Sequence, residues 1–279
     1  PRLSIPLWRG RHPVPRKVVL TNLFNHEQTP VHEGWSVRRR QVRDFRGKGM
    51  TYDSHNGTDL CIALGTTVLT AAAGRVVRVI SDFNRGGLKI FIDHGRGLMT
   101  CYAHMARSVV VEGQTLRRGE VIGLSGYSGL DGFITFPWGV PHVHLNTWLN
   151  GEPVDPFAND GRASLWRAGA LPLPPPAHSD ETVQPSTYDH DRVHQAIASC
   201  LTPRVRVRLN AIKDHDERAV HTIIEMNYYP TRFAKRSDVY SEPNPRDARL
   251  DLPFLESEFD GVMFWDEGER RPAKTGHPE

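Results

Sequence analysis

The 279-residue sequence predicts a mainly β fold, with an antiparallel sheet or sandwich as its largest part. The first observation is that short runs rich in β-branched residues, such as 74–80 and 88–93, fill residues 51–155. The second is that glycine-containing turns separate these runs about every 8–12 residues, a spacing typical of antiparallel sandwiches and barrels. The third is that no convincing amphipathic helix interrupts this region.

The individual strands are expected where a short apolar run is bounded by turn residues. Within 51–155 these runs are 59–63, 67–70, 74–80, 88–93, 98–102, 108–111, 120–124 and 142–149. Residues 1–50 are rich in Pro and Arg, which predicts an irregular basic arm with one edge strand at 18–20. Residues 36–45 alternate weakly, and we interpret them as a further strand that leads to a glycine turn at 47–49.

The basic arm carries most of the positive charge of the chain. It contains eleven Lys and Arg residues against Glu27, Glu33 and Asp44, whereas the whole chain has a net charge of only +3. One interpretation is attraction to a polyanion such as nucleic acid, an anionic membrane or an acidic wall polymer. The other is an ordinary solvated face, which the lack of interleaved aromatic residues favours. We therefore expect no nucleic-acid partner.

The cysteines are few and odd in number, namely Cys61, Cys101 and Cys200. They form no C-x-x-C motif and predict no disulfide framework. A bridge between Cys61 and Cys101 would require neighbouring strands, and burial as small hydrophobes is the default. The sequence has no apolar run of about 18 residues, so no transmembrane segment is expected. No signal peptide is visible, and one removed before Pro1 would leave no trace.

The segment after residue 160 predicts a linker and a second, smaller unit. Residues 171–176 read Leu-Pro-Leu-Pro-Pro-Pro, so we interpret 161–187 as an extended Pro-rich linker. Residues 188–279 are expected to form a small α+β unit of unknown role. In this unit, 189–200 predicts a short helix, and the strict alternation of 204–209 predicts a half-buried strand. Residues 219–224 are then expected to be its hairpin partner.

Two short motifs carry the chemistry that the sequence indicates. One is H-x-G-x-D, with His55 and Asp59, and the other is H-x-H, with His142 and His144. Residues two apart in a strand point to the same face. One His, one Asp and one His can supply three ligands to a tetrahedral zinc ion and leave a fourth position for water. Nitrogen and oxygen donors suit zinc, although other divalent first-row metals are possible.

Of the fourteen histidines in the chain, most have no partner at a meaningful spacing. His94 lies in a predicted hairpin turn, where a structural role is the better interpretation. His104 lies on another predicted strand. Hydrolysis of an amide requires groups that accept and donate protons, and an imidazole with a pKa near 6.5 suits both tasks. Three ligands and two further histidines would therefore form a complete set for peptide hydrolysis. No role is assigned to His12, His26, His32, His178, His190, His194, His215, His221 and His277.

The motifs also occur in the order of a known family. Residues 50–157 resemble the lysostaphin-type, LytM-like zinc metalloendopeptidases, which cut peptide bonds in bacterial cell-wall peptidoglycan. Each motif is weak alone, but their number and order make the resemblance specific. The matching segments are H-x-G-x-D at 55–59, D-H-G at 93–95, Y-A-H-M at 102–105, glycine turns at 119–123 and 126–129, P-H-V-H-L at 141–145 and N-G-x-x-V-x-P at 150–156.

The resemblance implies a β-sheet metallopeptidase domain over 51–160 with an open groove. It implies that His55, Asp59 and His144 bind zinc. It also implies that His104 and His142 flank the scissile carbonyl as acid/base and oxyanion-stabilising groups. The expected function is a zinc-dependent endopeptidase of DD-endopeptidase or glycyl-glycine type, acting on stem or cross-bridge peptides of peptidoglycan. A periplasmic or extracellular location in the cell envelope follows from this substrate class.

The sequence departs from the family pattern in two places. The loop 130–140 is longer than usual and aromatic, so Phe133, Phe136 and Trp138 are predicted to form a groove wall. The alternative is a flap packed over the β core. Residues 170–279 resemble no recognised wall-binding module.

Two rival functions remain open at this point. One is a catalytically silent binding or activator module with the same fold, against which the intact ligand positions argue. The other is a phosphocarrier domain that transfers phosphoryl groups through paired histidines. The phosphocarrier hypothesis leaves Asp59 and the H-x-H motif unexplained.

Overall fold

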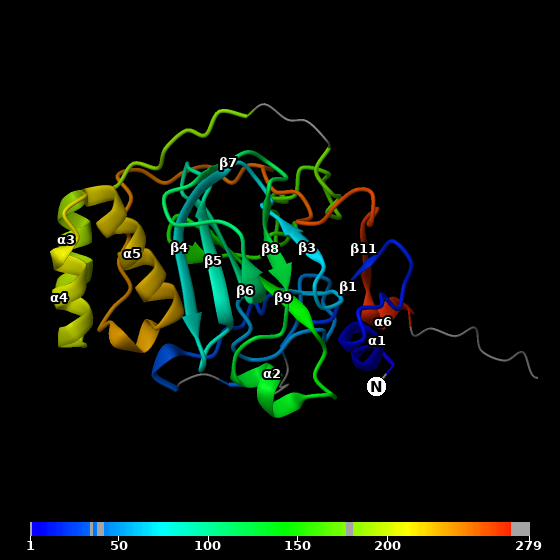
Figure 1. The fold of residues 1–279 in the computed structure, drawn as a ribbon. Coiled ribbons are helices and arrows are strands. Elements are labelled where there is room, and N and C mark those ends of the chain that lie inside the picture. Colours follow the sequence, from blue (N-terminus) through cyan, green and yellow to red (C-terminus); the bar gives the residue numbers. More distant parts are fainter. Residues whose placement is uncertain (1, 34–35, 38–41, 177–180, 269–279) are drawn as a thin grey trace, which may run out of the picture.

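A computed structural model of the chain describes residues 2–33, 36–37, 42–176 and 181–268. Its largest feature is a strongly twisted, mostly antiparallel sheet, which confirms the predicted mainly β class (Figure 1). The main path of the sheet runs β11-β1-β2-β9-β6-β5-β4-β7, and β3, β8 and β10 pair beside it. The strands are β1 (Val18–Leu20), β2 (Thr58–Cys61), β3 (Thr67–Leu69), β4 (Gly74–Asp82), β5 (Gly87–Asp93), β6 (Leu98–Ser108), β7 (Thr115–Leu116), β8 (Val121–Ser125), β9 (His142–Leu149), β10 (Glu152–Pro153) and β11 (Val262–Phe264).

The helices lie outside this sheet. Three of them, α3, α4 and α5, are neighbours at one side of the molecule, whereas α1 and α6 lie near β11 (Figure 1). The helices are α1 (Ser4–Trp8), α2 (Leu130–Thr135), α3 (His190–Ala198), α4 (Pro203–Ala211), α5 (His215–Tyr228) and α6 (Trp265–Gly268), with short 3₁₀ helices η1 (Val31–Glu33) and η2 (Pro230–Arg232).

Most strands of the central region form where the apolar runs predict them. The run 108–111 is an exception, because β6 already ends at Ser108 and residues 109–111 form no strand. The strand expected at 36–45 is also wrong for the described residues 36–37 and 42–45, and 38–41 lie outside the described part. Here the Asp44 carboxylate accepts hydrogen bonds from the backbone N–H groups of Arg46 and Lys48. Such side-chain bonds favour a turn over a strand.

Both faces of the sheet are buried, and alternate residues of one strand serve different cores. In β5, Ile90 and Ile92 belong to one hydrophobic cluster, whereas Phe91 belongs to another. The first cluster contains Tyr102 and side chains from the C-terminal segment, and the second joins Trp148 to helices α3–α5. This arrangement follows from the period of two along a strand. The C-terminal helices are therefore packed directly on the sheet.

Two expectations for the C-terminal segment are wrong, because the strands expected at 204–209 and 219–224 lie in α4 and α5. The alternation in α4 also places Val205 and Leu209 four residues apart on one buried helix face, while Val207 is 69% exposed. Pro203 at the first helical turn is compatible with a helix start. The period-two pattern was therefore ambiguous. The short helix expected at 189–200 is confirmed as α3, and Asp189 caps its N-terminus.

The basic arm is joined to the sheet through β1. This strand pairs antiparallel with β2 and parallel with β11, so β11 lies outside it and β1 is not at the edge of the sheet. Several cations of the arm pair with acids of the C-terminal segment. Arg16 and Lys17 contact Asp260, and Arg46 contacts Asp266. These pairs neutralise part of the charge surplus within the protein itself.

The cysteines behave as buried small hydrophobes. Cys61, Cys101 and Cys200 are all free thiols. The possible bridge between Cys61 and Cys101 is not formed, because β9 lies between β2 and β6 in the sheet. No helix in the described part of the chain is both long and apolar enough to cross a membrane.

His94 is buried between the sheet and a neighbouring turn. Its Nδ1–H donates to the carbonyl of Ala73 over 2.9 Å, and its Nε2 accepts from the Thr100 hydroxyl over 2.8 Å. A carbonyl can only accept, so Nδ1 carries the proton, and the Thr100 hydroxyl can donate to Nε2 of the neutral ring. Burial lowers the pKa of His94 to about 3. The imidazole is therefore neutral in the folded protein at physiological pH.

This burial predicts an acid-dependent loss of stability. In the unfolded chain His94 binds a proton below about pH 6.5, whereas in the folded chain it does so only below about pH 3. Protonation therefore favours the unfolded chain, and the stability present above pH 6.5 is lost as the pH falls. His94→Gln keeps a donor and an acceptor but removes this titration. Between about pH 6 and pH 4, we expect its free energy of unfolding to fall less steeply, by up to about 1.4 kcal/mol per pH unit. Denaturant unfolding of the zinc-free proteins measures both slopes, and equal slopes would contradict the prediction.

Candidate metal centre

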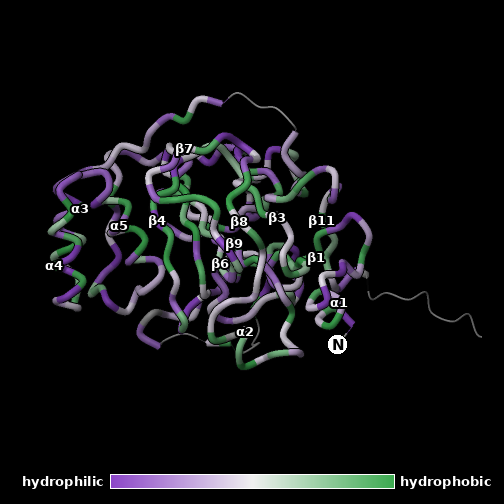
Figure 2. The backbone as a smooth tube through the Cα atoms, in the orientation of Figure 1, coloured by the Kyte–Doolittle hydropathy of each residue, from purple (hydrophilic) through white to green (hydrophobic). Residues whose placement is uncertain are grey.

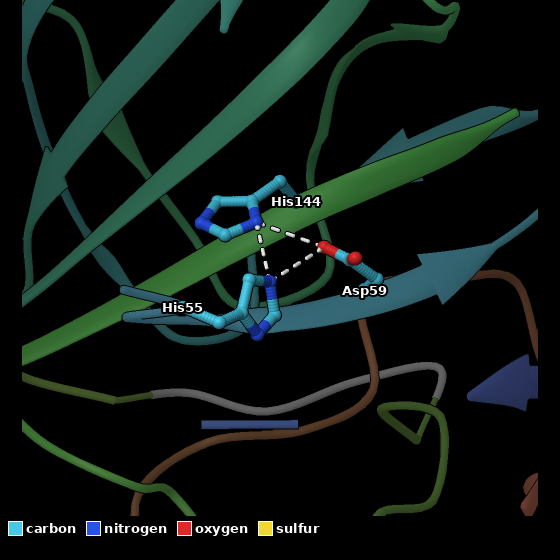
Figure 3. A group of neighbouring side chains, drawn as sticks. All are labelled: His55, Asp59 and His144. Carbon is cyan, nitrogen blue, oxygen red and sulfur yellow. Dashed lines mark hydrogen bonds and ion pairs between the residues drawn. The ribbon is translucent and has the colours of Figure 1, made fainter. Parts of the chain in front are cut away.

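The candidate site is assembled mainly by the pairing of β2 with β9. In this antiparallel register, Asp59 lies opposite His144 and Cys61 lies opposite His142. His55 comes from the loop that enters β2, and its ring points at the same place (Figure 3). The two sequence motifs, about 85 residues apart, thus meet on neighbouring strands. The predicted ligands His55, Asp59 and His144 are brought together.

The donor atoms of these three residues lie close to one another. Asp59 Oδ1 is 2.8 Å from His144 Nδ1 and 3.2 Å from His55 Nε2, and the two ring nitrogens are 3.3 Å apart (Figure 3). Ligand atoms placed at zinc–donor lengths around a tetrahedral ion are about 3.3 Å apart. Among the described residues, this is the one group of three metal-ligating side chains found. The donor set and its spacing fit zinc.

The local sequence explains how the donors come so close. A Cβ atom on Gly57 would lie 2.6 Å from His144 Nε2 and 2.7 Å from the carbonyl oxygen of Leu145. Distances this short are not tolerated between non-bonded atoms, so any side chain here would displace the ring. The glycine of H-x-G-x-D is therefore required by the approach of β9 to the ligand loop.

The surroundings of the three groups shift their pKa values in different directions. Burial alone would raise the pKa of Asp59, but the charges of His142 and His55 and hydrogen bonds from His144 and His55 hold it well below its usual range. Burial lowers the pKa of His144. Burial acts in the same direction on His55, but the neighbouring Asp59 carboxylate outweighs it and raises the pKa of that ring. An ionised carboxylate and a neutral imidazole are the states that a metal ion requires, so Asp59 and His144 are prepared for a cation, whereas metal binding must displace the proton that Asp59 favours on His55.

His142 and His104 lie beside the three candidate ligands. Each donates its Nδ1–H to a backbone carbonyl over 2.8 Å, His142 to Val140 and His104 to Ser128. In both rings, Nε2 is therefore the nitrogen left for other partners, and that of His142 lies 3.5 Å from Asp59 Oδ1. The ring centroids of His104 and His142 are 4.8 Å apart. Burial, and then the charge of His142, lower the pKa of His104 to about 3.

His104 reaches this group through an irregularity in β6. Its neighbour Ala103 pairs with His144. Strict alternation would therefore point His104 to the opposite face. Between Leu88 and Ile90, however, the register with β5 shifts, and β6 contains an extra residue there. His104 has a φ of +61°, a left-handed conformation that is strained for a residue with a side chain. This β-bulge re-aims the imidazole towards His142.

The three aromatic residues predicted as a groove wall lie on and just after α2. Phe133, Phe136 and Trp138 are 77%, 61% and 67% exposed, and hydrophobic residues recur along this segment (Figure 2). The segment contacts the rest of the protein at several points, since the Phe136 ring packs edge-on against Trp8 at 4.8 Å and the backbone N–H of Leu130 donates to the carbonyl of Phe83. It therefore presents apolar rings to solvent instead of covering them. We refer to Phe133, Phe136 and Trp138 as the α2 aromatic patch.

Sequence reasoning missed two residues that touch the site. The Tyr127 ring lies edge-on to His104 and tilted to His142, with ring centroids 5.6 Å and 5.2 Å away. Its position in the glycine turn 126–129 is visible in the sequence, but no local pattern indicates which residues it contacts. Asn22 donates its side-chain N–H to Asp59 Oδ2 over 2.7 Å. No sequence signal pointed to Asn22, because the contact joins residues 37 positions apart.

Two histidines and an aspartate thus converge on an antiparallel sheet, with two more histidines alongside, and this arrangement is suited to holding a metal ion. Residues 53–156, a little over a third of the chain, match the model of Peptidase family M23. The resemblance to LytM-like enzymes noted from the motifs is thereby confirmed.

Individual relatives share this domain. The chain is 35% identical over 103 residues to an uncharacterized metalloprotease of Haemophilus influenzae, covering 37% of this chain and 20% of that protein. It is 36% identical over 118 residues to peptidoglycan DD-endopeptidase ShyA of Vibrio cholerae, covering 42% and 25%. The chain thus spans a quarter or less of the length of these relatives. A solved zinc-containing peptidase from Vibrio cholerae is 26% identical, with a TM-score of 0.37 and coverage of 50% and 38%.

Proposed function

We propose that this chain is a zinc-dependent endopeptidase that hydrolyses peptide bonds in the stem or cross-bridge peptides of bacterial peptidoglycan. The observation that carries the proposal is the convergence of His55, Asp59 and His144, whose donor atoms lie 2.8–3.3 Å apart. Two nitrogen donors and one oxygen donor leave one tetrahedral position open, as in catalytic zinc sites.

The residues divide into two groups by role. His55, Asp59 and His144 would hold the zinc ion through Nε2, Oδ1 and Nδ1. Zinc, when bound, acts as a Lewis acid and makes water nucleophilic at neutral pH. His104 and His142 present Nε2 towards the same space, because their Nδ1–H groups are held by carbonyls. Such rings can accept a proton from water, donate one to the leaving amine, or stabilise the oxyanion.

The substrate class rests on the relatives. ShyA is named as a peptidoglycan DD-endopeptidase and is 36% identical to this chain over 118 residues. All five site residues lie within 53–156, the segment that matches Peptidase family M23. Peptidoglycan lies outside the cytoplasmic membrane, so the proposed activity places this domain in the periplasm or elsewhere in the cell envelope. The main rival function is a catalytically silent binding or activator module, and an activity assay must distinguish it from the proposed endopeptidase.

Digestion of purified sacculi tests the proposal directly. Zinc-loaded protein should release peptide fragments from at least one wall type, and mass spectrometry of the fragments identifies the bond that is cut. The matched control is His142→Ala, which keeps the three candidate ligands. Zinc binding without release of fragments from any wall type would favour the silent binding or activator module. A wild-type chain that binds no zinc would contradict the proposal.

The α2 aromatic patch predicts an effect on substrate binding. Trp138→Ala combined with Phe133→Ala should raise KM for soluble peptidoglycan fragments about 3–10-fold per ring and leave kcat nearly unchanged. A ring contact contributes about 0.5–1.5 kcal/mol, and these rings lie outside the histidine group. Val207→Ala, which removes an equally exposed side chain from the distant helix α4, is the control. An unchanged KM in the double variant would show that the patch is not a groove wall.

A further inference from the structure

The segment that follows β1 runs alongside the ligand loop and contacts two of the three candidate ligands. The Asn22 side-chain N–H donates to Asp59 Oδ2 over 2.7 Å, and the Asp59 backbone N–H donates to the Asn22 carbonyl over 2.9 Å. The carbonyl of Leu23 accepts Nδ1–H of His55 over 2.7 Å. The backbone N–H of Asn25 donates to the His55 carbonyl over 2.8 Å. The Asn22 amide and the backbone groups of this segment therefore hold both His55 and Asp59 in place.

This segment is itself held in place. Leu23 is fully buried, its N–H donates to the carbonyl of Met50, and its carbonyl also accepts the Thr51 hydroxyl over 2.7 Å. On the other side, β1 is bound between β2 and β11, and β11 comes from the end of the described chain. The carbonyl that orients His55 and the amide that contacts Asp59 thus stand on a fixed backbone.

Because of the contact with Asn22, the two carboxylate oxygens of Asp59 have different partners. Oδ1 faces His144 Nδ1 and His55 Nε2, whereas Oδ2 is taken by the Asn22 amide. An amide N–H that holds one oxygen restrains rotation of the carboxylate about its terminal bond. The other oxygen is then presented to a cation as a single, preoriented donor. Outer partners of this kind orient ligands and adjust metal affinity.

We propose that Asn22 is a positioning residue of the metal centre, which sets its zinc affinity by holding Asp59 with Oδ1 towards His55 and His144. The inference rests on the zinc site assigned under the proposed function. It also means that the family-matching segment 53–156 does not hold the whole centre. The Asn22 amide and the Leu23 carbonyl also belong to it, and β11 secures the arm that carries them through β1.

Two substitutions remove the donor in different ways. Asn22→Ala shortens the side chain, and Asn22→Leu keeps a similar volume without an N–H group. Both should weaken zinc binding about 10–100-fold, as loss of an outer partner typically does. Asn25→Ala is the matched control from the same segment, because it keeps the Asn25 backbone N–H that bonds to His55 and removes only the side-chain amide. The Asn25 side-chain amide donates to the carbonyls of Glu27 and Asp53 and to no candidate ligand.

The experiment uses the full chain, stripped with a chelator and titrated with zinc against a chromophoric competitor. The melting temperature of each zinc-free protein is recorded alongside. The expected result is a weaker Kd for both Asn22 variants at a melting temperature close to that of the wild type. Asn25→Ala should lower the melting temperature and keep the wild-type Kd. Cobalt(II) absorption spectra add a second readout, since a rotated carboxylate should change the ligand-field bands of both Asn22 variants.

The outcomes separate the two proposals. If the wild type binds zinc and both Asn22 variants bind it within about threefold, the positioning role is overturned and the proposed function stands. If Asn25→Ala weakens binding as much as the Asn22 variants do, the effect belongs to the stability of the arm and the positioning role is overturned again. If the wild type binds no zinc, both proposals fail. Should one Asn22 variant not fold, the other still decides.

Discussion

Replacing His144 by alanine is expected to abolish zinc retention and, with it, peptidoglycan hydrolysis. The substitution removes Nδ1, the donor that lies 2.8 Å from Asp59 Oδ1 and 3.3 Å from His55 Nε2. Asp59→Ala should have the same result, because it removes the negative charge of the site and leaves buried rings without their partner. Metal analysis after gel filtration should fall from about one zinc per chain, as expected for a catalytic site, to nearly none.

The control for this prediction is His94→Gln. It alters another buried imidazole, which bonds to Ala73 and Thr100 and takes no part in the candidate centre. This variant should retain zinc like the wild type. Retention of zinc by both His144→Ala and Asp59→Ala would show that the metal, if present, is bound elsewhere.

Replacing His104 or His142 by alanine is expected to leave zinc bound and to lower turnover about 10²–10⁴-fold, the usual contribution of general acid–base groups. The His104 ring centroid is 6.4 Å from that of His144, and its Nδ1–H is bound to Ser128, so it does not belong to the ligand group. His142 does contact Asp59, at 3.5 Å. Its loss should therefore change metal affinity more than the loss of His104.

Kinetics on a soluble cross-linked fragment and metal analysis of the same samples measure this prediction. The expected pattern is a reduced kcat at unchanged zinc content for His104→Ala. A zinc-free His104→Ala protein would mean that the division between ligands and proton-transfer groups is wrong. The double variant should lose little more than the worse single variant if the two rings act in one step, because residues that act as a unit are not additive.

Local sequence patterns were sufficient to predict the strands around the site. The β-branched runs at β5 and β9 alternate between two buried faces, and glycine turns mark their ends. The H-x-H spacing alone predicts that His142 and His144 share a face. The same reasoning failed for α4, where Val205 and Leu209 satisfy a strand and a helix equally well. A short alternating run is ambiguous unless its packing partner is known.

Three features of the site are set by tertiary structure alone. The register of β2 against β9 places Asp59 opposite His144. A β-bulge in β6, which residue spacing does not predict, turns His104 towards His142. Packing of the arm brings Asn22 to Asp59, and the partner that holds the arm, β11, lies more than two hundred residues further along the chain.

The sequence by itself therefore determined which residue types could form a metal centre, the mainly β fold class and the resemblance of residues 50–157 to LytM-like proteins, which the match of residues 53–156 to Peptidase family M23 confirms. Tertiary structure decided how those residues are oriented and which outer groups support them. The physical reason is the range of the interactions involved. Periodicity and turn preference act over a few residues, whereas strand register, the position of a bulge and contacts such as Asn22 to Asp59 depend on the packing of distant segments.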